Sequence, residues 1–152
     1  MKEIKGSFAG KGQRIIIAIS RFNEFISNQL LVGCIDALKK SGVKDDDITV
    51  VWAPGSFEIP QLLTKIDEKK YDAAIALGAV IRGETPHFDY VAAEVSKGVA
   101  KISLDKKFPI IFGVITADTV EQAIERAGTK HGNKGRDAAL AALEIANIYS
   151  QL

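Results

Sequence analysis

The chain has 152 residues, of which 47% are hydrophobic and 26% are charged, and its formal net charge at pH 7 is +1. These values are typical of an ordinary globular protein, and we expect residues 1–152 to form a single domain. A nearly neutral chain offers no electrostatic reason to expect nucleic acid or an anionic membrane surface as a partner. One cysteine, Cys34, excludes an intrachain disulfide, and the residues after Met1 lack the apolar core of a signal peptide, so we expect a cytoplasmic protein.

Apolar, β-branched runs recur along the chain and predict four buried strands. Residues 1–8 precede them and are interpreted either as a short edge strand or as a loose arm. The longest apolar run, residues 73–81, is far too short to span a bilayer. The predicted strands are Arg14–Ser20, Asp47–Trp52, Asp72–Ile81 and Pro109–Thr116.

Segments with helical spacing of apolar residues follow the strands. In the first of them Cys34 stands among apolar residues, which favours a buried thiol over a reactive one. The predicted helices are Asn23–Ser41, Phe57–Glu68, a long helix with Thr85 as N-cap and Pro86 as first residue, Asp118–Ala127, and Arg136–Ser150 after a glycine-rich turn over Gly128–Gly135. Regular alternation predicts an α/β fold, a three-layer αβα sandwich around a four-stranded parallel sheet, with a short N-terminal strand added.

Ligands of open parallel sheets bind outside the carboxyl ends of the strands, and polar and aromatic residues stand there in this chain. Ser20-Arg21-Phe22-Asn23 follows the first strand, and Pro54-Gly55-Ser56-Phe57-Glu58 follows the second. The third strand runs into Arg82-Gly83-Glu84-Thr85 and then His87. The sequence therefore predicts a binding site at this edge of the sheet.

The turn after the third strand has the features of an anion site beside an imidazole. Backbone N–H groups of Gly83, Glu84 and Thr85 at a helix N-terminus favour a phosphate, although a plain helix start is an alternative interpretation. His87 is a candidate general base or proton shuttle, or else a solvated residue of the first helical turn. Asp89 either orients that imidazole or favours the helix N-terminus.

A second basic group lies near the glycine-rich turn, and two aromatic residues stand at strand ends. Arg126, Lys130, Lys134 and Arg136 either bind phosphate or line a solvated turn, and His131 is interpreted as a surface residue. Phe22 is predicted to stack on a flat heterocycle or to pack, whereas Trp52 is more often a core residue. Glu58 beside Ser56 could hold a polyol or simply favour the start of its helix.

Taken together, these motifs resemble the 6,7-dimethyl-8-ribityllumazine synthase family over almost the whole chain. The resemblance is carried by Ser20–Asn23, Pro54–Pro60, Gly78–Tyr90, Phe112–Thr116 and Glu121–Gly135. It implies a flavodoxin-like sheet and an enzyme of the penultimate step of riboflavin biosynthesis. The implied reaction condenses 5-amino-6-ribitylaminouracil with 3,4-dihydroxy-2-butanone 4-phosphate and needs no metal or redox cofactor.

The resemblance also implies roles for single residues. The pyrimidine would stack on Phe22 and bond backbone groups of Val80 and Ile81, and the ribityl chain would be held by Ser56, Phe57 and Glu58. The phosphate would be bound by Gly83, Glu84 and Thr85 together with Arg126, and protons would be moved by His87. The site would be completed by Phe112, Lys134 and Asp137. Phe112 and Arg126 would come from a neighbouring subunit. Glu84 departs from the small residue expected there, and its carboxylate would weaken phosphate binding.

The same resemblance implies an assembly. The turn Gly128–Gly135 carries no insertion, as in family members that assemble twelve pentamers into a 60-subunit icosahedral capsid, which can enclose riboflavin synthase. Two other functions are alternatives when the residues are considered without the resemblance. One is a non-catalytic flavin or lumazine carrier or shell protein, which would not need His87 together with Arg126. The other is a flavodoxin-like regulatory or electron-transfer module, which would purify as a yellow protein.

Overall fold

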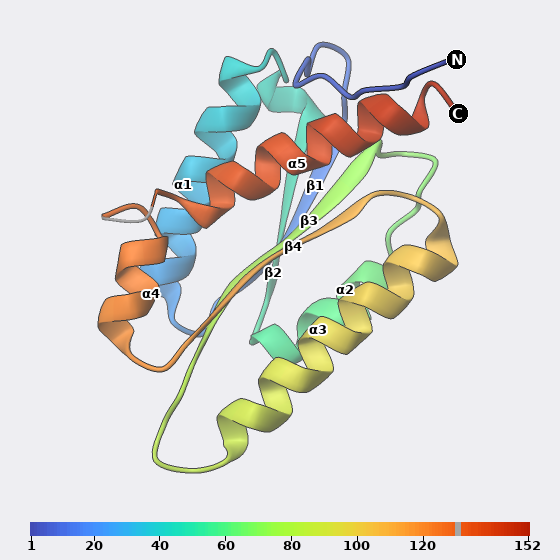
Figure 1. Cartoon of the computed structure of the whole chain (residues 1–152). Helices are drawn as coiled ribbons and strands as arrows, with labels where there is room; N and C mark the ends of the chain where they lie inside the picture. The colour runs from blue at the N-terminus through green and yellow to red at the C-terminus, as the bar shows by residue number, and fades with distance from the viewer. Residues whose placement is uncertain (130–131) are drawn as a thin grey trace.

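The computed structural model describes residues 1–129 and 132–152 of the chain. Four strands form one sheet in the order β2-β1-β3-β4, and all neighbouring strands are parallel (Figure 1). The strands are β1 (Ile15–Ser20), β2 (Ile48–Ala53), β3 (Ala73–Ile81) and β4 (Ile110–Ala117). The predicted four-stranded parallel sheet is therefore confirmed, and each strand end lies within one residue of its expected place.

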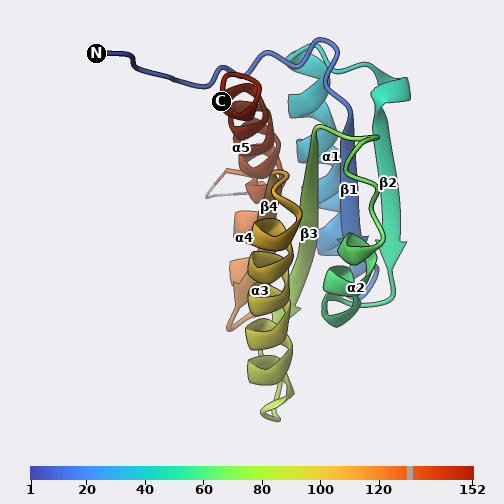
Figure 2. The same ribbon diagram turned by 90° about the vertical axis from the view of Figure 1, so that its right-hand side faces the viewer.

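Helices cover both faces of this sheet, which confirms the predicted three layers (Figure 2). In the described residues they are α1 (Glu24–Lys40), α2 (Ile59–Thr64), α3 (His87–Lys106), α4 (Val120–Arg126) and α5 (Lys134–Tyr149), with short 3-10 turns η1 (Asp45–Asp47) and η2 (Ser56–Glu58). Helices α1, α4 and α5 pack on one face, and α2 and α3 on the other.

Alternate side chains of β1 pack into the two layers of the core, one on each face of the sheet. Ile15, Ile17 and Ile19 are fully buried against α1 and α5, whereas Ile16 and Ala18 belong to the layer under α2 and α3. A strand buried on both faces needs apolar residues at every position, which explains the unbroken isoleucine run.

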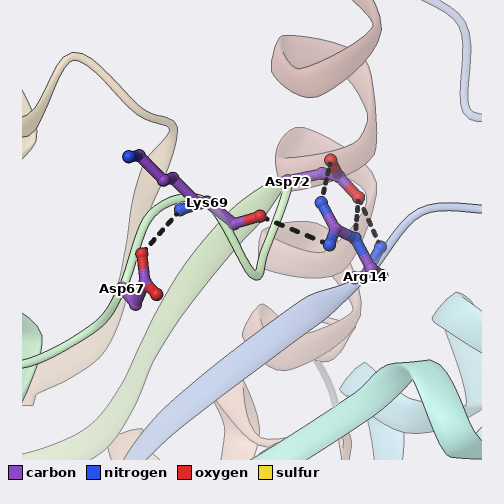
Figure 3. Close-up of polar contacts among 4 residues, drawn as sticks. All are labelled: Arg14, Asp67, Lys69 and Asp72. Atoms are coloured by element: carbon purple, nitrogen blue, oxygen red, sulfur yellow. Dashed lines mark hydrogen bonds and ion pairs between the residues drawn. The ribbon is translucent and has the colours of Figure 1, made fainter.

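Helix α2 is shorter than the predicted segment Phe57–Glu68, since residues 56–58 form the turn η2 and the helix ends at Thr64 with Lys65 as its C-cap. The Asp67 carboxylate accepts a hydrogen bond from the Lys69 backbone N–H at 3.0 Å, an alternative to helix that short polar side chains often offer (Figure 3). Asp72 then accepts from the Arg14 backbone N–H at 2.7 Å and pairs with its guanidinium at 3.3 Å. These bonds join the amino ends of β1 and β3, far from the carboxyl ends where the ligand is expected.

Residues 1–10 form no helix or strand in this structure, so the short N-terminal strand predicted for this segment is not observed here. The segment runs past the end of α5, where the Asn147 side-chain amide donates to Ser7 O at 2.9 Å and to Ala9 O at 3.0 Å (Figure 2). A strand needs a partner with free backbone groups, and within the chain this arm meets a helix whose backbone is already paired. The alternative interpretation, a loose arm, fits this position better.

The strand order places a topological switch between β1 and β3. The chain passes from β1 outward to β2, then crosses back over β1 to β3 and on to β4. Loops that leave β1 and β3 therefore diverge to opposite faces, which opens a crevice at their carboxyl ends. In the described part of the chain, no helix combines the length and apolar character needed to cross a membrane.

Candidate functional site

A cavity of about 670 Å³ lies in this crevice, at the carboxyl ends of β1, β2 and β3 and beside the start of α3. Its size suits a small organic ligand. The lining residues are Phe22, Asn23, Pro54, Gly55, Ser56, Phe57, Glu58, Ala79, Val80, Ile81, Gly83, Thr85, His87, Phe88 and Val91. Nine of the fourteen sequence-predicted site residues are among them: Phe22, Ser56, Phe57, Glu58, Val80, Ile81, Gly83, Thr85 and His87.

Phe22 stands at one side of the cavity, and the residue after it fixes the bend of the chain. The Phe22 side chain is 72% exposed, so its face is open to a ligand rather than packed in the core. Asn23 has φ 61° and ψ 46°, a left-handed conformation that asparagine tolerates better than most residues. Its side-chain amide donates to Ala79 O at 3.0 Å, which ties the end of β1 to β3. Asn23 was not among the predicted site residues, although an asparagine three residues after a predicted strand is a recognisable turn signal.

Two buried hydroxyl groups meet at Gly78, just before the lining residues of β3. Ser20 is fully buried and Ser56 is 6% exposed. A Cβ atom at Gly78 would lie 2.9 Å from Ser56 Oγ and even closer to Ser20 Oγ, so the site requires glycine there. Ser56 follows in the turn η2 with Phe57 and Glu58, which places a hydroxyl, a ring and a carboxylate side by side on the cavity wall.

The predicted anion turn has free backbone donors. Among the described residues, the N–H groups of Gly83, Glu84 and Thr85 make no hydrogen bond to the protein. Helix α3 begins at His87 with Pro86 as its N-cap, so the prediction of Thr85 as N-cap is wrong by one residue, and the Thr85 hydroxyl caps nothing. Gly83 and Thr85 line the cavity, whereas the Glu84 side chain is exposed and lies outside the lining.

His87 is exposed on the first turn of α3 and lines the cavity. In the described part of the chain its imidazole has no hydrogen-bonding or ionic partner, so both ring nitrogens are available to a ligand. Asp89 does not orient this imidazole. It pairs instead with Arg82, at 3.3 Å between Oδ1 and Nη1. Of the two interpretations of Asp89, the one that gave it to His87 is therefore wrong.

The remaining predicted residues gather elsewhere. A second cavity, of about 380 Å³, lies along β4 and is bounded by α5 and the end of α4. Phe112, Arg126, Lys134 and Asp137 all line it, and it shares no lining residue with the first cavity. The Arg126 guanidinium donates to Gln122 O at 3.1 Å, and Lys134 lies 3.5 Å from the Asp137 carboxylate.

Charge is divided between the two cavities. Among the described residues, neither arginine nor lysine lines the first cavity, while Arg126 and Lys134 line the second. The cavity with the backbone donors of the turn is therefore not lined by the cations, and the cavity with the cations is not lined by that turn. Trp52, 41% exposed, lies in neither the core nor these two cavities. Lys130 and His131 lie outside the described residues.

The fold and the first cavity define an α/β protein with a cavity of the size of a small organic ligand at the switch point of a parallel sheet. Such a cavity, with an aromatic face, an imidazole and free backbone donors, suits proton-transfer chemistry on an anionic substrate. Comparison with protein families matches residues 12–150 to the 6,7-dimethyl-8-ribityllumazine synthase family. The chain belongs to this family of enzymes, which catalyses the penultimate step of riboflavin biosynthesis.

Proposed function

We propose that this protein condenses 5-amino-6-(D-ribitylamino)uracil with 3,4-dihydroxy-2-butanone 4-phosphate to give 6,7-dimethyl-8-ribityllumazine, inorganic phosphate and water. The observation that carries the proposal is the first cavity, in which Phe22, Ser56, Glu58 and His87 surround one space in a member of the family. Each half of this substrate pair has a matching group on the cavity wall.

The pyrimidine is assigned to the face of Phe22 and the backbone groups of Val80 and Ile81. The ribityl hydroxyls are assigned to Ser56 and Glu58, since a carboxylate accepts hydrogen bonds from a polyol and a hydroxyl both donates and accepts them. The phosphate of the ketone is assigned to the free N–H groups of Gly83, Glu84 and Thr85. Because backbone donors bind it, the Glu84 side chain need not touch the phosphate.

His87 is assigned the proton transfers. The amino group of the uracil attacks the ketone carbonyl, and loss of water leaves an imine. Removal of a proton next to the imine carbon then expels phosphate as the C–O bond breaks, and ring closure with loss of a second water gives the lumazine. An imidazole without a protein partner can accept the proton in one step and return it in another.

The cationic partner of the phosphate is assigned to a neighbouring copy of the chain. No arginine or lysine of residues 1–129 and 132–152 lines the first cavity. Arg126 with Lys134, Phe112 and Asp137 lines a second cavity of the same chain. Joining the first cavity of one copy to the second cavity of the next supplies the missing charge. Repeated around a ring, this head-to-tail contact closes a cyclic oligomer, for which we propose a pentamer.

We further propose that the pentamers assemble into a 60-subunit icosahedral shell able to enclose riboflavin synthase. Support comes from the uninserted turn at 128–135 and the family membership. Light scattering and mass photometry should give a particle of about sixty chains in phosphate buffer. Only pentamers or decamers at every salt and phosphate concentration would contradict the shell while leaving the ring intact.

The reaction is tested by incubating the purified protein with both compounds. Absorbance of the lumazine and released phosphate should rise together, in equal amounts and well above the rate without protein. Tight binding of the lumazine with no increase in either rate would instead identify a carrier and overturn the proposed reaction.

A further inference from the structure

We propose that Arg82 is a positioning residue, which holds the phosphate turn 83–85 in place by tying it to Asp118 and Asp89. The inference rests on the proposed function, since it concerns the same anion site. Arg82 is absent from the lining of the cavity and was not among the predicted site residues.

Arg82 joins three elements where β3 ends. Its Nε donates to Asp118 Oδ1, just after β4, at 2.9 Å, and its Nη1 lies 3.3 Å from Asp89 Oδ1 in the first turn of α3. Its guanidinium carbon lies 4.4 Å from the centroid of the Phe88 ring, which lines the cavity. The side chain thus links the exit of β3, the start of α3 and the end of β4.

The turn depends on this side chain because it has few other ties. The Arg82 backbone N–H donates to Ala117 O at 2.9 Å, and the Asp89 N–H donates to Pro86 O at 3.0 Å. Between these two bonds, in the described structure, Gly83, Glu84 and Thr85 make no hydrogen bond to the protein. Figure 1 shows this loop projecting beyond the sheet between β3 and α3. Without Arg82, the donors would have to order when phosphate binds, at an entropic cost to affinity.

Charge distinguishes positioning from direct phosphate binding. One guanidinium faces two carboxylates, and the hydrogen bond to Asp118, with the charges of Asp89 and Asp118, raises the pKa of Arg82. A cation already shared between two carboxylates has little net charge left for a phosphate. If the guanidinium bound the phosphate directly, the nearby carboxylates of Asp118 and Asp89 would repel that phosphate. If instead the guanidinium acts as a clamp, holding the turn by its bonds to Asp118 and Asp89, these two carboxylates are required for the clamp to form.

The clamp is not expected to stabilise the fold. All three charged side chains are about half exposed or more, and exposed ion pairs contribute little to unfolding free energy. Replacement of Arg82 should therefore change the phosphate site while leaving the melting temperature almost unchanged.

The test is calorimetric titration of the assembled protein with inorganic phosphate. We expect Arg82→Ala to weaken phosphate binding by about five- to tenfold, the loss of roughly one ordinary interaction. Arg82→Lys should also weaken it, because a lysine keeps the charge but cannot bond both carboxylates in the planar fork. Lys101→Ala removes another exposed ion pair of α3, the 2.7 Å contact with Asp105, and should change nothing.

Asp118→Ala is the decisive variant. If Arg82 acts through Asp118, this change weakens phosphate binding although it removes a negative charge, and the double variant is no weaker than Arg82→Ala alone. Tighter phosphate binding by Asp118→Ala would show a direct contact by Arg82 and overturn the inference. Unchanged affinity in Arg82→Ala, or no phosphate binding by the parent protein, would overturn it as well.

The same samples separate this inference from the proposed function. If the parent forms lumazine but Arg82→Ala binds phosphate normally, the reaction stands and the inference fails. If phosphate binding depends on Arg82 and Asp118 as expected but no lumazine forms, the inference stands and the reaction fails. With an active parent, Arg82→Ala should raise KM for the phosphorylated ketone and leave KM for the ribitylaminouracil nearly unchanged.

Discussion

At the scale of single residues, function depends on which side chains are already engaged. Asp89 is two residues from His87, yet it pairs with Arg82, and in the part of the chain that the structure describes the imidazole has no partner. A free, exposed imidazole at a cavity wall can move protons without first breaking an internal bond. Conversely, the two carboxylates around Arg82 keep that arginine from serving as an open cation.

Replacing His87 by Ala should lower kcat by roughly 10²-fold, the usual loss for a positioned proton-transfer group. Because the side chain is exposed and has no partner in the described structure, the melting temperature should stay the same. Steady-state kinetics measures the first effect and calorimetry the second. A kcat within a factor of about two of the parent would remove His87 from the mechanism and leave binding alone to account for the rate.

Cys34 should be unreactive in the folded protein. The thiol is fully buried, which confirms its predicted place in the core, and burial raises its pKa to about 12. At pH 8 the thiolate that attacks alkylating reagents is therefore scarce as well as inaccessible. Iodoacetamide should label the protein only in denaturant, as read by mass spectrometry, and rapid labelling in buffer would contradict the buried position.

Burial of the Cys34 thiol also gives a pH dependence with a definite sign. The unfolded thiol loses its proton near its ordinary pKa of 9.0, and the folded one only near 12. The contribution of this group to stability is therefore complete below pH 9 and is lost as the pH rises toward 12. Cys34→Ala should lose less of its stability than the parent over this alkaline range.

At the scale of elements, one asparagine organises the start of α5. Asn133 Oδ1 accepts from the Arg136 N–H at 3.0 Å and so caps the helix, which is why α5 begins two residues before the predicted Arg136. Its Nδ2 donates to Gln29 O of α1 and to Ala127 O after α4, both at 2.9 Å. Three helices are thus joined at the end of α5 that carries Lys134 and Asp137 to the second cavity.

Asn133→Ala should destabilise the protein by about 2–3 kcal/mol, because a cap and two further hydrogen bonds are lost together. Thr119→Ala is the matched control, since it removes only a cap, the 3.1 Å bond from the Gln122 N–H, and should cost about 1 kcal/mol. Chemical denaturation of both variants measures the difference.

Asn133→Asp separates the two contributions of this side chain. A carboxylate can still cap α5, but it would face the carbonyl oxygens of Gln29 and Ala127, which it cannot bond. We expect Asn133→Asp to be at least as unstable as Asn133→Ala. Stability equal to the parent would show that the cap alone matters.

At the scale of the whole molecule, the division into two cavities is the central feature. His87 and Arg126 line different cavities of one chain, although the proposed reaction needs both in one site. In a head-to-tail ring every chain would give its first cavity to one neighbour and its second cavity to the other. Each active site would then lie at the contact between two neighbouring chains.

Mixing two inactive variants tests this arrangement. His87→Ala and Arg126→Ala are denatured together in equal amounts and refolded, and each is refolded alone as a control. An intact site needs an intact His87 from one chain and an intact Arg126 from the next, which random mixing provides in about one site in four. The mixture should recover about a quarter of the parent activity above the residual rates. No gain, with exchange of chains confirmed by mass spectrometry, would place both residues on one chain.

Most of the fold follows from local patterns in the sequence. Each of the four predicted strands is present, because an apolar β-branched run has few other stable arrangements. Boundaries that depend on one polar side chain were harder to predict. Asn133 starts α5 early, and Asp67 bonds the Lys69 N–H where the predicted segment Phe57–Glu68 would have continued as a helix, and periodicity encodes neither hydrogen bond.

The candidate site, like the fold, has features that the sequence predicts and features that only the tertiary structure shows. The sequence by itself determined the family, the parallel sheet, and the gathering of Phe22, Ser56 and His87 at the carboxyl ends of the strands, because βαβ topology brings those ends to one edge. Only the tertiary structure decided that β4 lies at the sheet edge with Arg126 in a separate cavity, and that Arg82 pairs with a carboxylate 36 residues away. The physical reason is that strand order and ion pairing depend on how distant segments pack, and no local pattern of residues specifies which side chains then come within hydrogen-bonding distance.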